Sequence, residues 1–244
     1  MRPEAYIEMA EVQDEHWWFK GRREILRSVI ADLPLSESPR ILEIGAGTGG
    51  NLTMLSQFGS VKATEMDDYA RSFARQRTEE RVDIRQGSLP DGIPFDDEFD
   101  LVCLFDVLEH VERDLDSLRA IARLVSPAGC LLLTVPAYSW LWSAHDERLS
   151  HFRRYTAAGL TRKALEAGWI VRRLTYFNTL LFPLAVGARV IDKMFPGRQP
   201  AGTSIPAPIV NSAFYHVLSM EKALLRAFDF PFGVSLMAQL SLRS

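Results

Sequence analysis

Cysteine is scarce in this chain, and the two residues present, Cys103 and Cys130, both stand within apolar runs. Two thiols cannot form the disulfide framework on which small secreted domains depend. Neither cysteine has neighbours of the kind that would bind a metal with it. We therefore expect both to be reduced core residues and the protein to be cytoplasmic.

Long apolar runs and an excess of positive charge are missing as well. The longest nearly uncharged apolar run, 176–188, is shorter than the roughly 20 residues that a transmembrane helix needs. The N-terminal segment MRPEAYIEMAEVQDEHWWFK is acidic and lacks the apolar core of a signal peptide. With a formal net charge of -3 and its arginines scattered in pairs, the chain gives no reason to expect a nucleic acid as partner.

What the chain does contain is a regular alternation of short apolar runs and helical patterns between residues 40 and 176. Continuous apolar runs are typical of strands buried on both faces, and helices between them favour a parallel sheet wound by right-handed crossovers. We therefore predict a Rossmann-like α/β fold with helices on both faces of the sheet. The expected strands are 40–43, 61–65, 82–85, 99–105, 130–135, 169–176 and 234–242, and the expected helices 21–33, 51–58, 68–80, 111–125 and 157–167.

Two segments stand outside this alternation. Residues 1–34 are predicted to form an N-terminal helical lid on the α/β domain, which comprises residues 35–244. Within that domain, 177–231 is predicted to be an insertion that ends in an amphipathic helix. Its apolar side chains must be buried against something. Three partners are open: the sheet edge or site rim of a monomer, a second copy in a homodimer, or a membrane surface, where residues 180–186 would lie beside Arg189 and Lys193.

A glycine-rich turn, Glu43-Ile44-Gly45-Ala46-Gly47-Thr48-Gly49-Gly50-Asn51, joins the first strand of this domain to a helix. Glycine lets the chain turn tightly and lets a ligand approach the backbone, and helix N-terminal amides favour negative or polar groups. Glu65, at the end of the next strand, could accept both hydroxyls of a ribose. The same glycines also satisfy the dinucleotide-binding fingerprint G-x-G-x-x-G. The turn alone therefore leaves NAD and S-adenosylmethionine (SAM) equally open.

Three further features favour SAM. Glu43 stands two residues before the first glycine, where a carboxylate can meet a ligand's ammonium group. The third strand ends in RQGSLP (85–90), and PFDDEFD (94–100) leads into the fourth strand. The fourth strand ends in FDVLEHV (105–111), and LVSPAG (124–129) leads into the fifth. In order and spacing, the region from about residue 40 to 136 resembles the class I SAM-dependent methyltransferases of the small-molecule group.

The resemblance implies a SAM site along the ends of the first four strands. The glycines would line the methionine part, residue 43 would meet its amino group, and residue 65 would hold the ribose. Residues 66, 88 and 89 would surround the adenine, and residues 105 and 106 would begin the wall shared with the substrate. These residues are Glu43, Gly45, Gly47, Gly49, Glu65, Met66, Ser88, Leu89, Phe105 and Asp106. Ser88 stands where such enzymes often have Asp or Asn, so its hydroxyl or the backbone would have to accept the adenine amino group.

An aromatic run, His16-Trp17-Trp18-Phe19, is followed by Arg22 and Arg23. It forms either an amphipathic helix packed on the sheet or a lid over the cofactor. It resembles the aromatic-then-arginine opening of ubiquinone-type O-methyltransferases, and a guanidinium suits a bidentate contact with the SAM carboxylate. We expect Arg23 rather than Arg22 to make this contact, because it lies closer to the helix that adjoins the glycine turn.

Candidates for the chemistry follow the fourth and fifth strands, where ligands bind in open α/β sheets. His110, His145 and His151 are candidate general bases, although each could instead pack, cap or form a surface ion pair. The candidate substrate-binding residues are Tyr138, Trp142, Arg153, Arg154 and Tyr155. The spacing of the histidines along the chain gives no reason to expect a metal.

The sequence thus predicts a SAM-dependent methyltransferase that acts on a small molecule. A hydroxyl oxygen is the first choice of acceptor atom. An NAD-dependent oxidoreductase and a SAM-binding module without turnover remain as alternatives.

Overall fold

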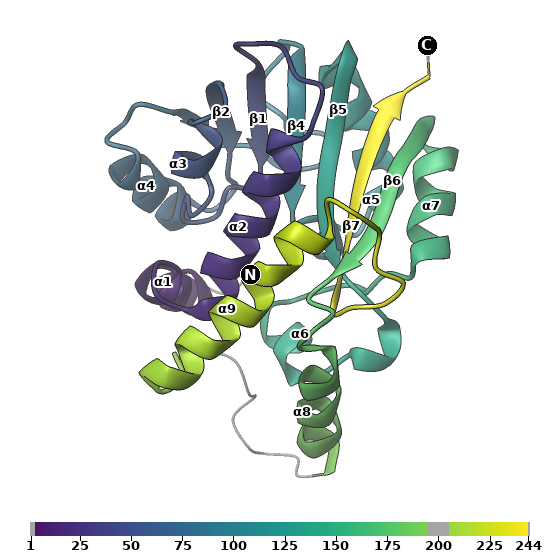
Figure 1. Cartoon of the computed structure of the whole chain (residues 1–244). Coiled ribbons are helices and arrows are strands. Elements are labelled where there is room, and N and C mark those ends of the chain that lie inside the picture. The colour runs from purple at the N-terminus through teal and green to yellow at the C-terminus, as the bar shows by residue number, and fades with distance from the viewer. Residues whose placement is uncertain (1–2, 195–204, 244) are drawn as a thin grey trace.

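The computed structural model describes residues 3–194 and 205–243, and the strands of this part of the chain form one seven-stranded sheet in the order β3-β2-β1-β4-β5-β7-β6 (Figure 1). The first five strands pair in parallel, whereas β7 runs antiparallel between β5 and β6. The predicted Rossmann-like fold is confirmed, and every expected strand is present within a few residues. The antiparallel β7 was not predicted. The strands are β1 (Arg40–Ile44), β2 (Ser60–Thr64), β3 (Asp83–Arg85), β4 (Phe99–Phe105), β5 (Val125–Pro136), β6 (Trp169–Phe177) and β7 (Ser235–Leu242).

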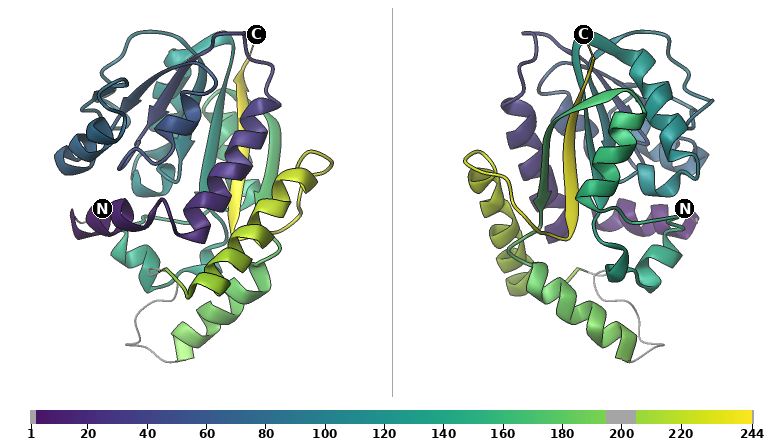
Figure 2. Two further views of the ribbon diagram at one scale, coloured as in Figure 1. Left: turned by 60° about the vertical axis from the view of Figure 1, so that its left-hand side comes forward. Right: turned by 90° about the vertical axis from the view of Figure 1, so that its right-hand side faces the viewer.

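Helices cover both faces of the sheet, with α2 and α9 over one face and α5 and α7 over the other (Figure 2). Local sequence signals set several of their ends: Asp67 caps the first turn of α4 by accepting from the Ala70 amide, and Gly168 follows α7 with a φ of 93°. α1 lies within the predicted N-terminal helical segment, whereas the short helix α6 was not predicted. The α-helices are α1 (Pro3–Val12), α2 (Trp17–Ala31), α3 (Leu52–Leu55), α4 (Asp68–Arg77), α5 (Asp114–Ile121), α6 (Ala144–Arg148), α7 (Ala157–Glu166), α8 (Phe182–Met194) and α9 (Pro208–Leu224).

An apolar core lies on each side of the sheet. The core under α5 and α7 contains Trp169, which is fully buried and whose indole N–H donates to the Leu118 carbonyl at 3.0 Å. The core under α2 and α9 contains Cys103 and Cys130, both free and buried as expected. The two cores pack on opposite faces of β4 and β5 and so fix the positions of the ends of these strands.

The insertion divides into two helices with different surroundings. α9 packs along α2, where an added Cβ on Gly21 would come within 2.8 Å of Leu218, and Trp17 meets Phe214 edge-on at 5.3 Å. α8 instead projects from the end of the molecule (Figure 2) and leaves Leu184 and Met194 59% and 66% exposed. Internal packing therefore accounts for the apolar face of α9. A homodimer contact through the predicted helix at 214–228 and a membrane contact through residues 180–186 stay predictions, and the side chain of Lys193 lies outside the described residues.

No helix among the described residues is both long enough and apolar enough to cross a bilayer.

A buried carboxylate ties the two helices of the insertion together. Glu221 of α9 is 0% exposed and accepts from the backbone amides of Asn178, Thr179 and Leu180 at 2.6, 2.7 and 2.8 Å. These amides precede α8, so the carboxylate gathers donors that would otherwise lack partners. Burial raises the pKa of Glu221 even though the three amides favour its charged form.

Removing this carboxylate should destabilise the protein. Glu221→Ala leaves three buried amides without an acceptor and should lower the free energy of unfolding by about 3 kcal/mol. Denaturant unfolding measures the change, and Glu98→Ala, at an exposed position, is the control. Equal small effects of the two substitutions would contradict the role given to Glu221.

Candidate active site

The glycine turn after β1 has one face open to a ligand. Gly45, Gly47 and Gly49 have φ values of 74°, 55° and 80°, a region that favours glycine. An added Cβ would lie 2.6 Å from Val107 at Gly45 and 3.0 Å from Ala74 at Gly49, so these two glycines are required for packing. At Gly47 the nearest atom would be the Met9 sulfur at 3.8 Å. Gly47 is thus the position at which a ligand could approach the backbone.

Glu43, at the end of β1, is a buried carboxyl group with a vacant acceptor. Its Oε1 accepts from the Asn51 side chain at 2.8 Å, whereas its buried Oε2 has no hydrogen-bond partner. Burial raises the pKa of Glu43 to about 7, against the opposing effects of Asn51 and Arg22. A cationic group of a ligand would satisfy this carboxylate and favour its charged form.

Glu65, which follows β2, faces the same turn. Its Oε2 accepts from the Gly47 amide at 2.8 Å, and its Oε1 accepts from the Asp67 amide at 3.0 Å and the Tyr6 hydroxyl at 3.4 Å. Each carboxylate oxygen can accept more than one hydrogen bond. Glu65 therefore lies where a diol could bind, and it already accepts a hydrogen bond from the glycine turn.

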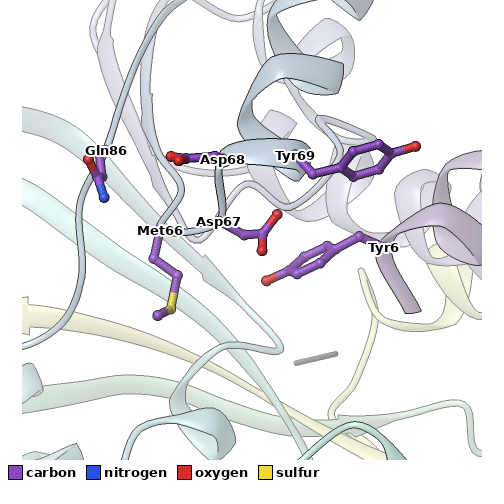
Figure 3. A pocket seen from close by; sticks show the side chains of 6 residues that line it. All are labelled: Tyr6, Met66, Asp67, Asp68, Tyr69 and Gln86. Atoms are coloured by element: carbon purple, nitrogen blue, oxygen red, sulfur yellow. The ribbon is translucent and has the colours of Figure 1, made fainter. Parts of the chain in front are cut away.

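Helix α1 lies across the carboxyl ends of the parallel strands (Figure 2). Besides Tyr6 and Met9, this segment contributes Gln13, whose Oε1 accepts from the Thr48 hydroxyl of the turn at 2.9 Å. Together Tyr6, Met66, Asp67, Asp68, Tyr69 and Gln86 line a pocket of about 350 Å³ (Figure 3). The pocket opens beside Met66, which is 63% exposed, so the predicted adenine-side residue lies at a real opening.

Arg22, and not Arg23, reaches the strand ends. The Arg22 guanidinium is buried, pairs with Asp106 at 2.7 Å and donates to the Thr134 hydroxyl at 3.2 Å. Its charge also lies over the Phe105 ring at 5.6 Å from the centroid. Arg23 instead donates to the Gln13 carbonyl at 2.8 Å and so holds the segment after α1. Arg22 occupies the position on α2 that faces the sheet, and contact of either arginine with the SAM carboxylate stays a prediction.

Two predicted adenine-binding residues lie in the segment after β3. Ser88 is exposed and forms a bridge with Gly92 through two backbone hydrogen bonds, and Leu89 packs against the core under α5 and α7. The exposed Ser88 hydroxyl can form a hydrogen bond with a bound ligand. Its contact with adenine stays a prediction.

Two of the three predicted histidines come together. The rings of His110 and His151 meet edge-on with centroids 4.5 Å apart, beside the buried Glu109. Burial, then the neighbouring His151, lowers the pKa of His110 to about 3. His145 lies apart from this cluster, and burial followed by the charge of Arg189 lowers its pKa to about 4.

Three of the predicted substrate-binding residues bind to carboxylates of the protein itself. Arg153 pairs with Asp114 at 2.7 Å, and the buried Tyr155 donates its hydroxyl to the same carboxylate at 2.9 Å. Arg154 pairs with the buried Asp146 at 2.7 Å. These three side chains hold the loop after β5, and their contact with a substrate stays a prediction.

The two aromatic candidates have different surroundings. Tyr138 stacks on Tyr176 at 5.3 Å and on Trp140 at 5.5 Å, near the start of α8. Trp142 is half-buried just after the 3-10 turn Ser139–Leu141. Both lie at the rim between the loop after β5 and the insertion, and substrate contact by either stays a prediction.

The site residues not predicted from the sequence are Tyr6, Gln13, Glu109 and Asp146, and Arg22 was placed second to Arg23. A signal existed for three of them. Tyr6 and Gln13 lie on one helical stripe with Met9. Ser143 and Asp146 form a capping box, in which the Ser143 amide donates to Asp146 at 2.9 Å. Arg22 and Glu109 had no local signal.

The sheet order with an antiparallel β7, together with the glycine turn after β1, defines a class I methyltransferase fold. A family model described as a methyltransferase domain matches residues 18–174. That is more than half of the chain, and the chain belongs to this methyltransferase domain family. The class I SAM-dependent methyltransferase family predicted from the sequence is thereby confirmed.

Individual relatives agree with this assignment. A protein of Mycobacterium tuberculosis named as a probable S-adenosylmethionine-dependent methyltransferase is 27% identical over 160 residues, which are 64% of this chain and 57% of that protein. An uncharacterized methyltransferase of Bacillus subtilis, YcgJ, is 29% identical over 136 residues, or 53% of each chain. This chain thus spans about half the length of the curated relatives it matches.

The fold is also found among solved structures. The structure of a complex between a Haloferax volcanii methyltransferase and the Trm112 methyltransferase activator superimposes with a TM-score of 0.64 and 18% identity. The match covers 98% of this chain and 94% of that one.

The raised pKa of Glu43 predicts a pH-dependent stability. The folded-state pKa of about 7 lies above the ordinary value of 4.5, so the stability it contributes is complete below about pH 4.5 and is lost as the pH rises through 7. Glu43→Gln should therefore raise the free energy of unfolding at about pH 8 by up to about 3 kcal/mol and change it little near pH 4. Denaturant unfolding of the ligand-free protein at the two pH values is the measurement. A substitution effect that does not vary with pH would show that folding leaves the pKa of Glu43 near its ordinary value.

Proposed function

We propose that this protein transfers a methyl group from SAM to a hydroxyl oxygen of a small molecule. The observation that carries the proposal is the pairing of an open Gly47 with the unpartnered carboxylate of Glu43 at the end of β1. A ligand with a cationic amino group fits this pair, and the dinucleotide NAD offers no ammonium for Glu43. The family membership and the names of the relatives support SAM over NAD.

The residues present fit the parts of SAM. Glu43 would meet the amino group, Glu65 the ribose hydroxyls, and the pocket beside Met66 would take the adenine. Arg22, with its buried charge among the strand ends, is better placed than Arg23 for the carboxylate side of the site. SAM supplies an activated methyl group when bound, so the protein's main task is to align the acceptor and exclude water.

Helix α1 is proposed to act as the lid over this site. Its contacts with the turn are few and polar: Tyr6 on Glu65, and Gln13 on Thr48. Surface ion pairs of Glu8 with Arg148 and of Asp14 with Arg77 complete its attachment. Exposed pairs contribute little stability, so α1 can lift away to admit a ligand without unfolding the sheet.

The three histidines differ in what they can do for a hydroxyl acceptor. His110 and His145 have pKa values of about 3 and 4, which make them weak general bases at neutral pH. His151 is oriented by a carboxylate, because its Nδ1–H donates to Asp146 at 2.9 Å. We therefore propose that His151 acts at the acceptor hydroxyl and that His145 does not.

The cofactor can be tested by calorimetric titration with SAM and with NAD. We expect SAM to bind and NAD not to bind, and Gly47→Val to weaken SAM binding by roughly 100-fold or more, because its side chain would occupy the open face of the turn. Gly187→Val, in the exposed helix α8 where an added Cβ meets no atom within 4 Å, is the control for glycine loss itself. Circular dichroism checks that both variants are folded. Normal SAM affinity in Gly47→Val would place the cofactor elsewhere.

The acceptor atom can be tested with matched pairs of candidate acceptors that differ only in carrying a hydroxyl or an amine. Incubation with SAM labelled in its methyl group should transfer label to the hydroxyl member of a pair, as read by mass spectrometry of the product. Preferential labelling of amines would overturn the choice of oxygen. SAM binding without labelling of any acceptor would favour the binding module without turnover.

A further inference from the structure

Three potential metal ligands converge just beyond the end of β4. Glu109 and His110 belong to the 3-10 turn Leu108–His110, and His151 follows α6. One ligand atom from each residue lies within 4.8 Å of the other two. Three atoms bound tetrahedrally to one ion at about 2.0–2.2 Å lie about 3.3–3.6 Å from one another, so the group closes by up to about 1.5 Å when it binds an ion.

Glu109 is a buried carboxyl group without a partner. It is 1% exposed, and neither of its carboxyl oxygens has a hydrogen bond. Burial and then the nearby charge of Asp106 raise its pKa well above the ordinary value. Buried polar groups in proteins are almost always paired, so an orphan carboxyl indicates a ligand that completes it.

His110 has a buried ring nitrogen without a hydrogen bond. The backbone of Leu149 and Ser150 lies beside its ring, and its Nδ1 has no partner. A neutral ring protonated at Nε2 has its lone pair on Nδ1. A neutral imidazole with one nitrogen held by a carbonyl is the form in which histidine binds metals.

His151 is held in the complementary tautomer. Its Nδ1–H donates to Asp146, which leaves Nε2 as the nitrogen with a lone pair. Burial alone would raise the pKa of Asp146, but the bonds from His151 and Arg154 and the charge of Arg154 outweigh it, and the pKa lies well below its ordinary value. Asp146 is thus a fixed carboxylate behind the histidine, the arrangement that orients metal-binding histidines in many proteins.

From this geometry we infer that Glu109, His110 and His151 bind a divalent transition-metal ion, with Asp146 and Arg154 orienting His151. Two imidazole nitrogens and one carboxylate favour ions such as Zn²⁺ or Co²⁺ over Mg²⁺. Three protein ligands leave open positions on the ion, as in catalytic rather than structural sites.

The site lies beside Asp106, at the wall that the proposed function gives to the substrate, and its role there depends on that function. An ion held at this point would bind the acceptor's hydroxyl oxygen and lower the pKa of that hydroxyl. His151, proposed above to act at the acceptor hydroxyl, would then do so through the ion and not by accepting the proton itself. The inferred site also replaces the expectation of no metal, which considered only histidines close in sequence.

The test is calorimetric titration of tag-free, chelator-treated protein with Zn²⁺, Co²⁺ and Mg²⁺ in the absence of SAM. We expect one Zn²⁺ or Co²⁺ per chain, weaker Mg²⁺ binding, and a visible absorption spectrum of the Co²⁺ form typical of nitrogen ligation. Glu109→Gln and His151→Ala should each abolish this binding. Asp146→Asn alters the contact that orients His151 as well as the contacts with Arg154 and Ser143, and should weaken metal binding by about 10- to 100-fold in a variant that circular dichroism shows to be folded.

His216→Ala, at an exposed position on α9, is the matched control and should bind metal normally. Glu109→Gln keeps the shape of a side chain that has no hydrogen bonds to lose, so it should fold. Metal binding that survives both Glu109→Gln and His151→Ala, or no binding of any of the three ions, would overturn the inference. SAM titration in the presence of chelator keeps the two questions separate: its failure would count against the proposed function, whereas methyl transfer that persists in chelator would count against the metal alone.

Discussion

The buried charge of Arg22 organises the candidate active site. It pairs with Asp106 and contacts Thr134, which lie at the ends of the two central strands, and its charge also acts on Glu43 and Glu109. One guanidinium therefore lies among three carboxyl groups, of which Glu43 and Glu109 are buried and Asp106 is partly exposed. A buried ion pair adds little to net stability, because both charges must leave water. The Arg22–Asp106 pair instead fixes the positions of the polar groups at the ends of β1, β4 and β5.

Several buried polar groups near Arg22 have no hydrogen-bond partner. Oε2 of Glu43, both oxygens of Glu109 and Nδ1 of His110 are buried without partners. Such groups destabilise a folded protein unless something binds them. Their grouping at the carboxyl ends of the parallel strands, the usual place for ligands in α/β sheets, suggests one site with two adjoining parts. The part at β1 has the chemistry to hold the cofactor, and the part beyond β4 has the chemistry to hold the acceptor.

Peripheral elements close this site from the sides. α2 brings Arg22 inward because α9 packs along its outer face, with Gly21 allowing the close approach of Leu218. α1 crosses the glycine turn through a few polar contacts. The insertion therefore contributes to the site indirectly, by holding α2, and its other helix, α8, is left with an exposed apolar surface.

By itself the sequence determined the order of strands and helices along the chain, the glycine turn, and the placement of Glu43 and Glu65 beside it. These features depend on apolar periodicity, on backbone conformations that favour glycine, and on short distances along the chain. Tertiary structure decided the antiparallel direction of β7, which of Arg22 and Arg23 faces the sheet, and the meeting of Glu109 and His110 with His151. The cluster joins residues about 40 positions apart, and the helix face that turns inward depends on the packing of α9. Spacing along the chain reveals neither the cluster nor the orientation of α2, because each forms only when segments distant in sequence pack together.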